Sequence, residues 1–166
     1  MTAERARVRP AVPGDIPLIL SLIRELAEYE RAPEQAVATP ELLESNLFGA
    51  GLGRGPTVEC VIGEIDGRAE GFALYFHNFS TWLGKPGLYL EDLFVRPGSR
   101  GLGLGKALFR HVAGVAVARG CGRMEWSVLD WNTPAIEFYR SMGAVAMDEW
   151  TVHRLTGEAL NRAASA

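Results

Sequence analysis

A run of glycines in the second half of the chain has the spacing best suited to chemistry. Arg100-Gly101-Leu102-Gly103-Leu104-Gly105-Lys106 follows an apolar stretch that resembles a strand and leads directly into a helical pattern. Glycines let the backbone expose several N–H groups together, and the positive end of the following helix dipole points the same way. Arg100 and Lys106 add positive charge at the two ends of the turn. The segment therefore predicts a phosphate-binding loop, although a plain glycine turn before a helix would show the same pattern.

The spacing of these glycines disfavours the two commonest nucleotide-binding loops. A dinucleotide fingerprint needs its third glycine three residues after the second, but Lys106 stands there and Gly105 comes one residue early. The P-loop needs a glycine five residues before Gly105 and a Ser or Thr after Lys106, and the chain has Arg100 and Ala107. The loop is thus not predicted to bind a dinucleotide or a nucleoside triphosphate.

The loop must be held by a strand before it and a helix after it, and similar signals divide the rest of the chain. Apolar and alternating runs predict a short first strand that ends at residues 8–11 and further strands at 57–65, 68–76, 88–95, 124–129 and 145–155. Asp66-Gly67 predicts a tight hairpin, and residues 77–87 are expected to form a loop. Apolar spacing and capping residues predict helices at 15–27, 39–49, 102–119 and 132–142, the first of them capped by Asp15. This order of elements predicts an α/β domain with a mixed sheet.

Composition and charge narrow the class of protein. The 166 residues suit one domain that buries its own core. No apolar run approaches the roughly 18 residues that span a bilayer, and the N-terminus lacks the apolar region of a signal peptide, so we expect a cytoplasmic protein without a membrane segment. A net charge of −3 without a basic block argues against nucleic acid as a partner. Cys60 and Cys121 have no histidine at ligand spacing, so neither a metal site nor a disulfide framework is predicted.

Two motifs in the second half of the chain carry a resemblance to a known superfamily. Residues 100–105 fill every fixed position of an Arg/Gln-x-x-Gly-x-Gly/Ala pyrophosphate loop, and residues 132–139 supply an Asn-x-x-Ala-x-x-Phe-Tyr stretch. The chain thereby resembles the GCN5-related N-acetyltransferases (GNAT). Further stretches are similar to its diamine (spermidine/spermine) and thialysine acetyltransferases: Glu25-Leu26-Ala27-Glu28-Tyr29-Glu30, Trp82-Leu83-Gly84-Lys85 and Tyr89-Leu90-Glu91-Asp92-Leu93-Phe94-Val95.

The resemblance implies a fold and a site for a co-substrate. The fold is a single α/β GNAT-like domain over residues 1–166, with its core at about 7–155 and a mixed, mostly antiparallel sheet flanked by helices. Two strands, one ending at Val95 and one beginning near Met124, would splay apart to admit acetyl-CoA, and no metal is implied. The residues implied to bind acetyl-CoA are Leu93, Phe94, Val95, Arg100, Gly101, Leu102, Gly103, Leu104, Gly105, Lys106, Asn132, Pro134, Ala135 and Tyr139. Asn132 would also serve simply as a helix cap.

Acetylation of an amine needs a group that removes a proton. A primary alkylamine has a pKa of about 10.4, so at neutral pH it is protonated and cannot attack a thioester. Glu91 is the candidate base. Regular alternation would place Glu91 and Asp92 on opposite faces of their strand, so either one acid is structural or a bulge redirects the strand, as in the resembled fold. A solvated strand carboxylate is the alternative for Glu91.

The departing CoA thiolate needs a proton, and Tyr139 is the candidate donor because the family's matching tyrosine has that role. Asn132, Ala135 and Tyr139 recur at three to four residues, which places the tyrosine on the helix side that would face the co-substrate. The alternative is a packed aromatic beside Phe138.

The resemblance implies an amine channel lined by Tyr29, Glu30, Trp82, Glu91 and Asp92, with a further residue near 148–149. Aromatic faces and carboxylates suit an alkylammonium ion, although Glu30 could equally be a solvated charge. The polyamine enzymes carry an acid two residues before the tryptophan of this loop, and the chain has Ser80 there. This difference favours thialysine, a lysine-like amino acid or a short amine over a long polycation.

The sequence therefore predicts an acetyl-CoA-dependent N-acetyltransferase that acts on a small primary amine, either a thialysine or lysine-like amino acid or a di- or polyamine. The resemblance also implies a homodimer. Two alternatives remain open. One is an acetyltransferase for a protein amine or an aminoglycoside, and the other is a non-catalytic acyl-CoA-binding module, which would need neither Glu91 nor Tyr139.

Overall fold

The computed structural model describes residues 6–165. The chain divides into two compact units, Met1–Ser127 and Val128–Ala166, and each is described by itself. Unit 1 contains the sheet and three α-helices, and unit 2 contains two α-helices. The prediction of a single domain stays a prediction.

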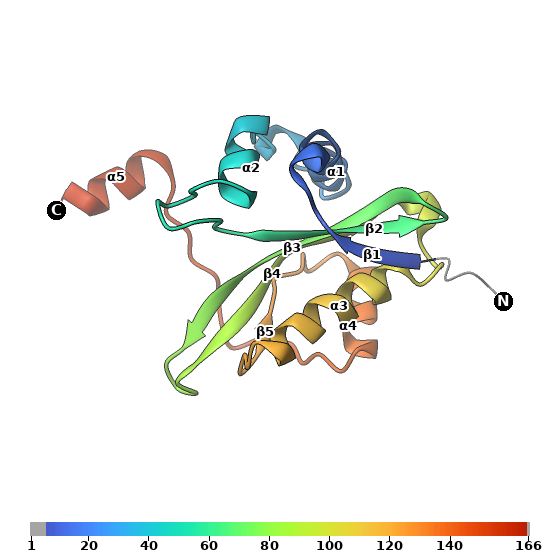
Figure 1. Cartoon of the computed structure of the whole chain (residues 1–166). Helices are drawn as coiled ribbons and strands as arrows, with labels where there is room; N and C mark the ends of the chain where they lie inside the picture. The colour runs from blue at the N-terminus through green and yellow to red at the C-terminus, as the bar shows by residue number, and fades with distance from the viewer. Residues whose placement is uncertain (1–5, 166) are drawn as a thin grey trace. The chain divides into compact units, whose positions relative to one another are not determined.

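Unit 1 is built on a five-stranded sheet in the order β1-β2-β3-β4-β5. Its strands are β1 (Ala6–Pro10), β2 (Glu59–Ile65), β3 (Arg68–Ser80), β4 (Lys85–Val95) and β5 (Met124–Glu125). The first four strands pair antiparallel, and β5 pairs parallel to β4. In Figure 1, α1 (Ile16–Tyr29) and α2 (Pro40–Leu47) cover one face of the sheet and α3 (Leu104–Ala118) covers the other. The predicted mixed, mostly antiparallel α/β fold is confirmed.

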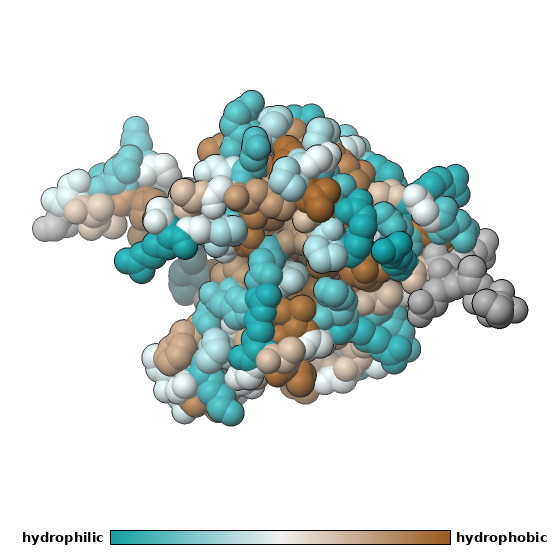
Figure 2. Space-filling model, viewed as in Figure 1, coloured by the Kyte–Doolittle hydropathy of each residue, from teal (hydrophilic) through white to brown (hydrophobic). Residues whose placement is uncertain are grey.

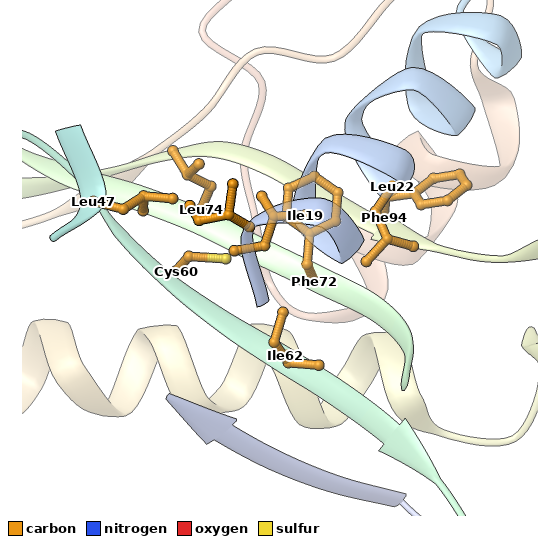
Figure 3. Packing of buried hydrophobic residues seen from close by; sticks show 9 residues of the cluster. Ile19, Leu22, Leu47, Cys60, Ile62, Phe72, Leu74 and Phe94 are labelled. Carbon is orange, nitrogen blue, oxygen red and sulfur yellow. The ribbon is translucent and has the colours of Figure 1, made fainter. Parts of the chain in front are cut away.

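One face of the sheet packs against α1 and α2 through a buried apolar cluster. Figure 3 shows Ile19 and Leu22 of α1 gathered with Phe72 of β3 and Phe94 of β4. Burying a side chain of this size stabilises the fold by roughly 1.5–3 kcal/mol. The apolar stripe of α1 is therefore what fixes this helix over β3 and β4, next to the acids of β4.

The other face packs closely against α3. A Cβ at Gly63 of β2 would lie 2.9 Å from Leu104 Cδ1 and 3.1 Å from Leu108 Cδ1, so glycine here lets the two leucines pack directly on the strand. This packing fixes the N-terminal end of α3, which directly follows the glycine loop. Polar residues cover much of the outside, and Figure 2 shows them interspersed with apolar ones on the face in view.

The hairpin between β2 and β3 forms where the sequence predicts it. Asp66 and Gly67 have φ values of 49° and 78°, as a two-residue hairpin turn with two left-handed positions requires. Short 3-10 turns precede or follow several helices: η1 (Pro13–Asp15), η2 (Pro33–Gln35) and η3 (Pro97–Ser99).

The predicted loop at residues 77–87 is wrong, because β3 and β4 continue through it and leave only residues 81–84 as a turn. The register pairs Asn78 with Gly87, and a Cβ at Gly87 would lie 2.2 Å from Asn78 Oδ1. Glycine here makes room for the asparagine across the ladder instead of breaking the strand. Gly84, with φ at 62°, supplies the turn.

The predicted last strand at residues 145–155 is also wrong. Unit 2 contains α4 (Thr133–Ser141) and α5 (Gly157–Ser165), and its described residues form no strand, so this segment has no ladder partner within its unit. Its apolar side chains are largely exposed, as at Val145 and Val152. The strand predicted at 124–129 is shortened to β5. Among the helices of residues 6–165, none is long and apolar enough to cross a bilayer.

Candidate active site

The sheet is open along part of β4. Leu88↔Met124 and Tyr89↔Glu125 are the two paired positions between β4 and β5, so residues 90–95 have β3 as their one ladder neighbour among the described strands. Tyr89 Oη and Ser127 Oγ lie 2.9 Å apart where the backbone pairing stops. An open strand edge can take an extended ligand as it would take another strand. The opening lies where the resemblance implies a splay between two strands.

The glycine loop has the backbone geometry of an anion-binding turn. Gly101 and Gly103 have φ values of 77° and 87°, a region that disfavours residues with a Cβ. Gly103 is the N-cap of α3, and Ala107 N donates to Gly103 O at 3.0 Å. The N–H groups of the first helical turn have no acceptor within a helix, so they are available to an anion. Arg100 and Lys106 are exposed beside them.

Arg100 joins the loop to the end of α1. Its Nε donates to Val95 O at 2.9 Å, and its guanidinium carbon lies 4.5 Å from the Tyr29 ring centroid and 5.9 Å from that of Phe94. The structure thus brings together three residues predicted to bind acetyl-CoA and one, Tyr29, predicted to line the amine channel.

A β-bulge in β4 determines how its two acids are presented. Asp92 pairs with Leu74 and Leu90 pairs with Tyr75, so Glu91 is one extra residue in the ladder. Leu74 belongs to the cluster that packs against α1. Asp92 therefore faces α1 and is half-buried, while Glu91 is exposed at the bulge. The bulge considered from the sequence is present.

The acids near the end of α1 share one electrostatic environment. Burial first, and then the negative charges of Glu91 and Glu30, together raise the pKa of Asp92 to about 7. Burial also raises the pKa of Glu30. Both effects disfavour the charged carboxylate, and a cation bound here would reverse them. Glu30 and Glu91, both predicted to contact the amine, thus lie within electrostatic reach of Asp92.

The structure does not bring Trp82 to this group. Trp82 lies in the turn at residues 81–84 and is 88% exposed. At a rise of about 3.3 Å per residue, the start of β4 is about 20 Å from Glu91 along the strand. The role of Trp82 in the amine channel stays a prediction.

Ser80 has a structural environment. It is 3% exposed, its Oγ accepts from Leu83 N at 3.3 Å, and Arg123 Nη1 lies 3.4 Å from it. An acid at this position would meet Arg123, which already pairs with Glu125 at 2.9 Å. The selectivity argument based on Ser80 stays a prediction.

The remaining predicted site residues lie on α4 in unit 2. Asn132 Oδ1 accepts from Ala135 N at 3.4 Å, so the asparagine caps the helix. Pro134 stands in the first turn, and Tyr139 packs against Phe138 with ring centroids 5.3 Å apart. These contacts fit the structural alternatives for Asn132 and Tyr139 and are compatible with the chemical ones.

The sequence analysis missed a residue that anchors the approach to the loop. Arg96 donates to both carboxylate oxygens of Glu25, at 2.7 and 2.8 Å, and to Ala69 O at 3.0 Å. This forked pair ties the residue after β4 to α1. Glu25 opens one of the stretches that carry the resemblance, and that position could have pointed to a partner. Among the described residues, no group of three or more His, Cys, Asp or Glu is arranged to hold a metal ion.

Comparison with known proteins identifies the family. Residues 19–144 match the model of the "Acetyltransferase (GNAT) family". The chain belongs to this family and is an N-acetyltransferase. Members of the family use acetyl-CoA as co-substrate.

Individual relatives cover nearly the whole chain. The chain is 38% identical to a thialysine N-epsilon-acetyltransferase of Bos taurus, over 95% of this chain and 96% of the relative. It is 35% identical to an L-ornithine N5-acetyltransferase of Arabidopsis thaliana, over 93% of this chain and 86% of the relative. An integron cassette protein from the mobile metagenome of V. cholerae has a similar structure, with a TM-score of 0.77 and 25% identity over 98% of this chain and 99% of that one. The resemblance stated from the motifs is confirmed.

Proposed function

We propose that the protein transfers the acetyl group of acetyl-CoA to the primary amine of a small molecule such as thialysine, a lysine-like amino acid or a di- or polyamine. The observation that carries the proposal is the group of Glu30, Glu91 and Asp92 beside the open edge of β4. Carboxylates form charge-assisted hydrogen bonds with an alkylammonium ion. Relatives named for thialysine and L-ornithine acetylation support this acceptor class.

The residues of unit 1 fit acetyl-CoA. The left-handed glycines and the N-terminus of α3 suit the pyrophosphate, with Arg100 and Lys106 adding positive charge. The open backbone of Leu93, Phe94 and Val95 suits the amide groups of the pantetheine arm. This arrangement would hold the thioester beside the acids of β4.

The reaction then requires two proton transfers. A carboxylate of the acidic group accepts the first proton from the ammonium ion, and the neutral nitrogen attacks the thioester carbonyl. The carbon–sulfur bond breaks as the amide forms, and the nitrogen loses its second proton. Tyr139 is the proposed donor to the leaving thiolate and regains a proton from that nitrogen or from solvent. The net products are the acetylated amine, CoA thiol and one released proton.

Release of CoA thiol from acetyl-CoA tests the proposal. The acceptors are thialysine, lysine, ornithine, putrescine, spermidine and a peptide with a free N-terminus, each measured as kcat/KM. We expect turnover of one or more of the small amines, with the peptide much slower. Faster turnover of the peptide would contradict the small-molecule proposal. Tight acetyl-CoA binding without turnover of any acceptor would favour a binding module.

The homodimer implied by the resemblance is likewise proposed for this chain. Sedimentation equilibrium of the purified protein tests it, because a dimer has twice the mass of the 18.1 kDa chain. A single species at the monomer mass over the micromolar range would contradict it.

A further inference from the structure

Asp92 lacks the arginine partner that five other partly buried carboxylates of unit 1 have. Five such acids pair with arginine: Asp15 and Glu64 with Arg9, Glu25 with Arg96, Glu59 with Arg119, and Glu125 with Arg123. Asp92 forms no ion pair with a Lys, Arg or His of residues 6–165. A half-buried carboxylate without a cation is costly to charge, and a cationic ligand would supply what the fold does not.

The bulge aims this acid at the face covered by α1. Asp92 lies opposite Leu74 of β3 and two residues before Phe94 of β4. Leu74 and Phe94 both belong to the apolar cluster. The titratable groups that act on this face are Glu30 at the end of α1, Glu91 at the bulge and Cys60 on β2. Arg100, stacked on Tyr29, pairs with a backbone carbonyl, that of Val95.

From this geometry we infer that Asp92, rather than Glu91, is the carboxylate that accepts the proton of the substrate ammonium group. The inference rests on the proposed function and names the base of that reaction. The N–H bond of the ammonium ion breaks, its electron pair stays on nitrogen, and the proton moves to a carboxylate oxygen of Asp92. The neutral nitrogen then attacks the thioester, and Asp92 returns the proton to solvent.

The protonation equilibrium of Asp92 suits this role better than that of an exposed acid. Burial raises the pKa of Asp92 to about 7. A base works best when its pKa lies near the working pH, because it is then both available and strong enough to take the proton. Glu91 and Glu30 contribute by their charge, which favours the proton on Asp92. They are positioning residues in this scheme.

The test compares Asp92→Asn, Glu91→Gln and Glu30→Gln by the pH dependence of kcat and kcat/KM with a small amine that the wild type acetylates. Glu28→Gln is the matched control. It removes an exposed carboxylate from the last turn of α1, one residue before Tyr29. Asp92→Asn should lower kcat by roughly a hundredfold or more and abolish the acidic limb of the profile. Glu91→Gln and Glu30→Gln should keep the limb and move it to lower pH, with a smaller loss of kcat.

Three results would overturn the inference. The first is loss of the limb in Glu91→Gln with the limb kept in Asp92→Asn, which would assign the base to Glu91. The second is a raised KM in Asp92→Asn with kcat and the limb retained, because Asp92 would then be only a counter-charge. The third is no turnover of any small amine by the wild type, which would remove the proposed function itself. Circular dichroism and the melting temperature of each variant separate these results from misfolding.

Discussion

The guanidinium of Arg100 lies 4.5 Å from the ring centroid of Tyr29, so the first residue of the glycine loop stacks on the last residue of α1. One side chain thereby touches both the predicted acetyl-CoA side and the predicted amine side of the site.

The Tyr29 ring should help to hold Arg100 at the loop. Tyr29→Leu removes the aromatic face, and a cation–π contact of about 1 kcal/mol corresponds to a rise of about fivefold in the KM for acetyl-CoA. Tyr29→Phe keeps the face and should raise this KM much less. Equal effects of the two variants on the KM would show that the hydroxyl, not the ring, matters.

Gly103 should be required for its backbone conformation. Gly103→Ala places a Cβ on a residue with φ at 87°, although the Cβ itself would meet no described atom within 4 Å. We expect the KM for acetyl-CoA to rise about tenfold or more as the loop relaxes to a different conformation, at a strain of about 1–2 kcal/mol. Gly98→Ala is the control, since Gly98 is equally uncrowded and has no left-handed φ. A similar loss in both variants would contradict the argument.

Replacement of Tyr139 should separate catalysis from binding. Tyr139→Phe keeps an aromatic ring beside Phe138, whose centroid lies 5.3 Å away, and removes the hydroxyl proton. We expect a fall of roughly a hundredfold in kcat with little change in the dissociation constant of acetyl-CoA, measured by calorimetry. Unchanged kcat would exclude Tyr139 as the acid.

Asp15 should stabilise the fold above acidic pH. Its carboxylate accepts from Arg9 at 2.7 and 2.9 Å and from Val12 N at 2.8 Å, and the hydrogen bond from Arg9 lowers its pKa. A lowered folded-state pKa gives stability above the unfolded-state pKa of about 3.9 that is lost as the pH falls further. Asp15→Asn should therefore cost about 2 kcal/mol at pH 7 and much less near pH 2.

Urea unfolding at both pH values measures this difference. Glu158→Gln is the control, because the Glu158 side chain is 92% exposed and its ion pair with Arg162 should contribute little. A loss of stability in Asp15→Asn that does not depend on pH would point to packing rather than charge.

Asp92 should have the opposite effect on stability. Its folded-state pKa, raised to about 7, lies above the unfolded value, so its charge destabilises the fold progressively as the pH rises from about 4 to 7. Asp92→Asn should raise the melting temperature at pH 8 by about 2–4 °C, corresponding to roughly 1 kcal/mol in a chain of this size, and have little effect at pH 4. A lower melting temperature at pH 8 would contradict the burial argument.

The features that the sequence predicted correctly depend on local backbone requirements. The turns at Asp66-Gly67 and at the loop glycines can be predicted from the local sequence alone, because few other residues accept a left-handed φ. The glycines of the motif that begins at Arg100 likewise predicted a turn directly before a helix. The family resemblance extended these local signals to almost the whole chain.

The errors arose where distant partners decide the structure. Gly87 by itself predicts a break in the strand, but in the structure it pairs with Asn78 inside the ladder. Residues 145–155 alternate like a strand, but a strand also needs a neighbour. Asp15 was expected to cap α1 with its side chain, and Arg9 and Val12 N take that carboxylate instead. The face taken by Asp92 depended in the same way on Leu74, across the ladder.

Because Glu91 is the extra residue of the bulge, its deletion would leave the other side chains of β4 on the faces that they occupy now. Deleting a residue from a regular strand turns every later side chain to the opposite face. Without Glu91, however, Leu90 and Asp92 would become adjacent and still face Tyr75 and Leu74 in an unbroken ladder. The hairpin could thus have been one residue shorter at no cost to its pattern. The ladder therefore does not use the extra residue, and what this residue adds to the strand is a second acid next to Asp92.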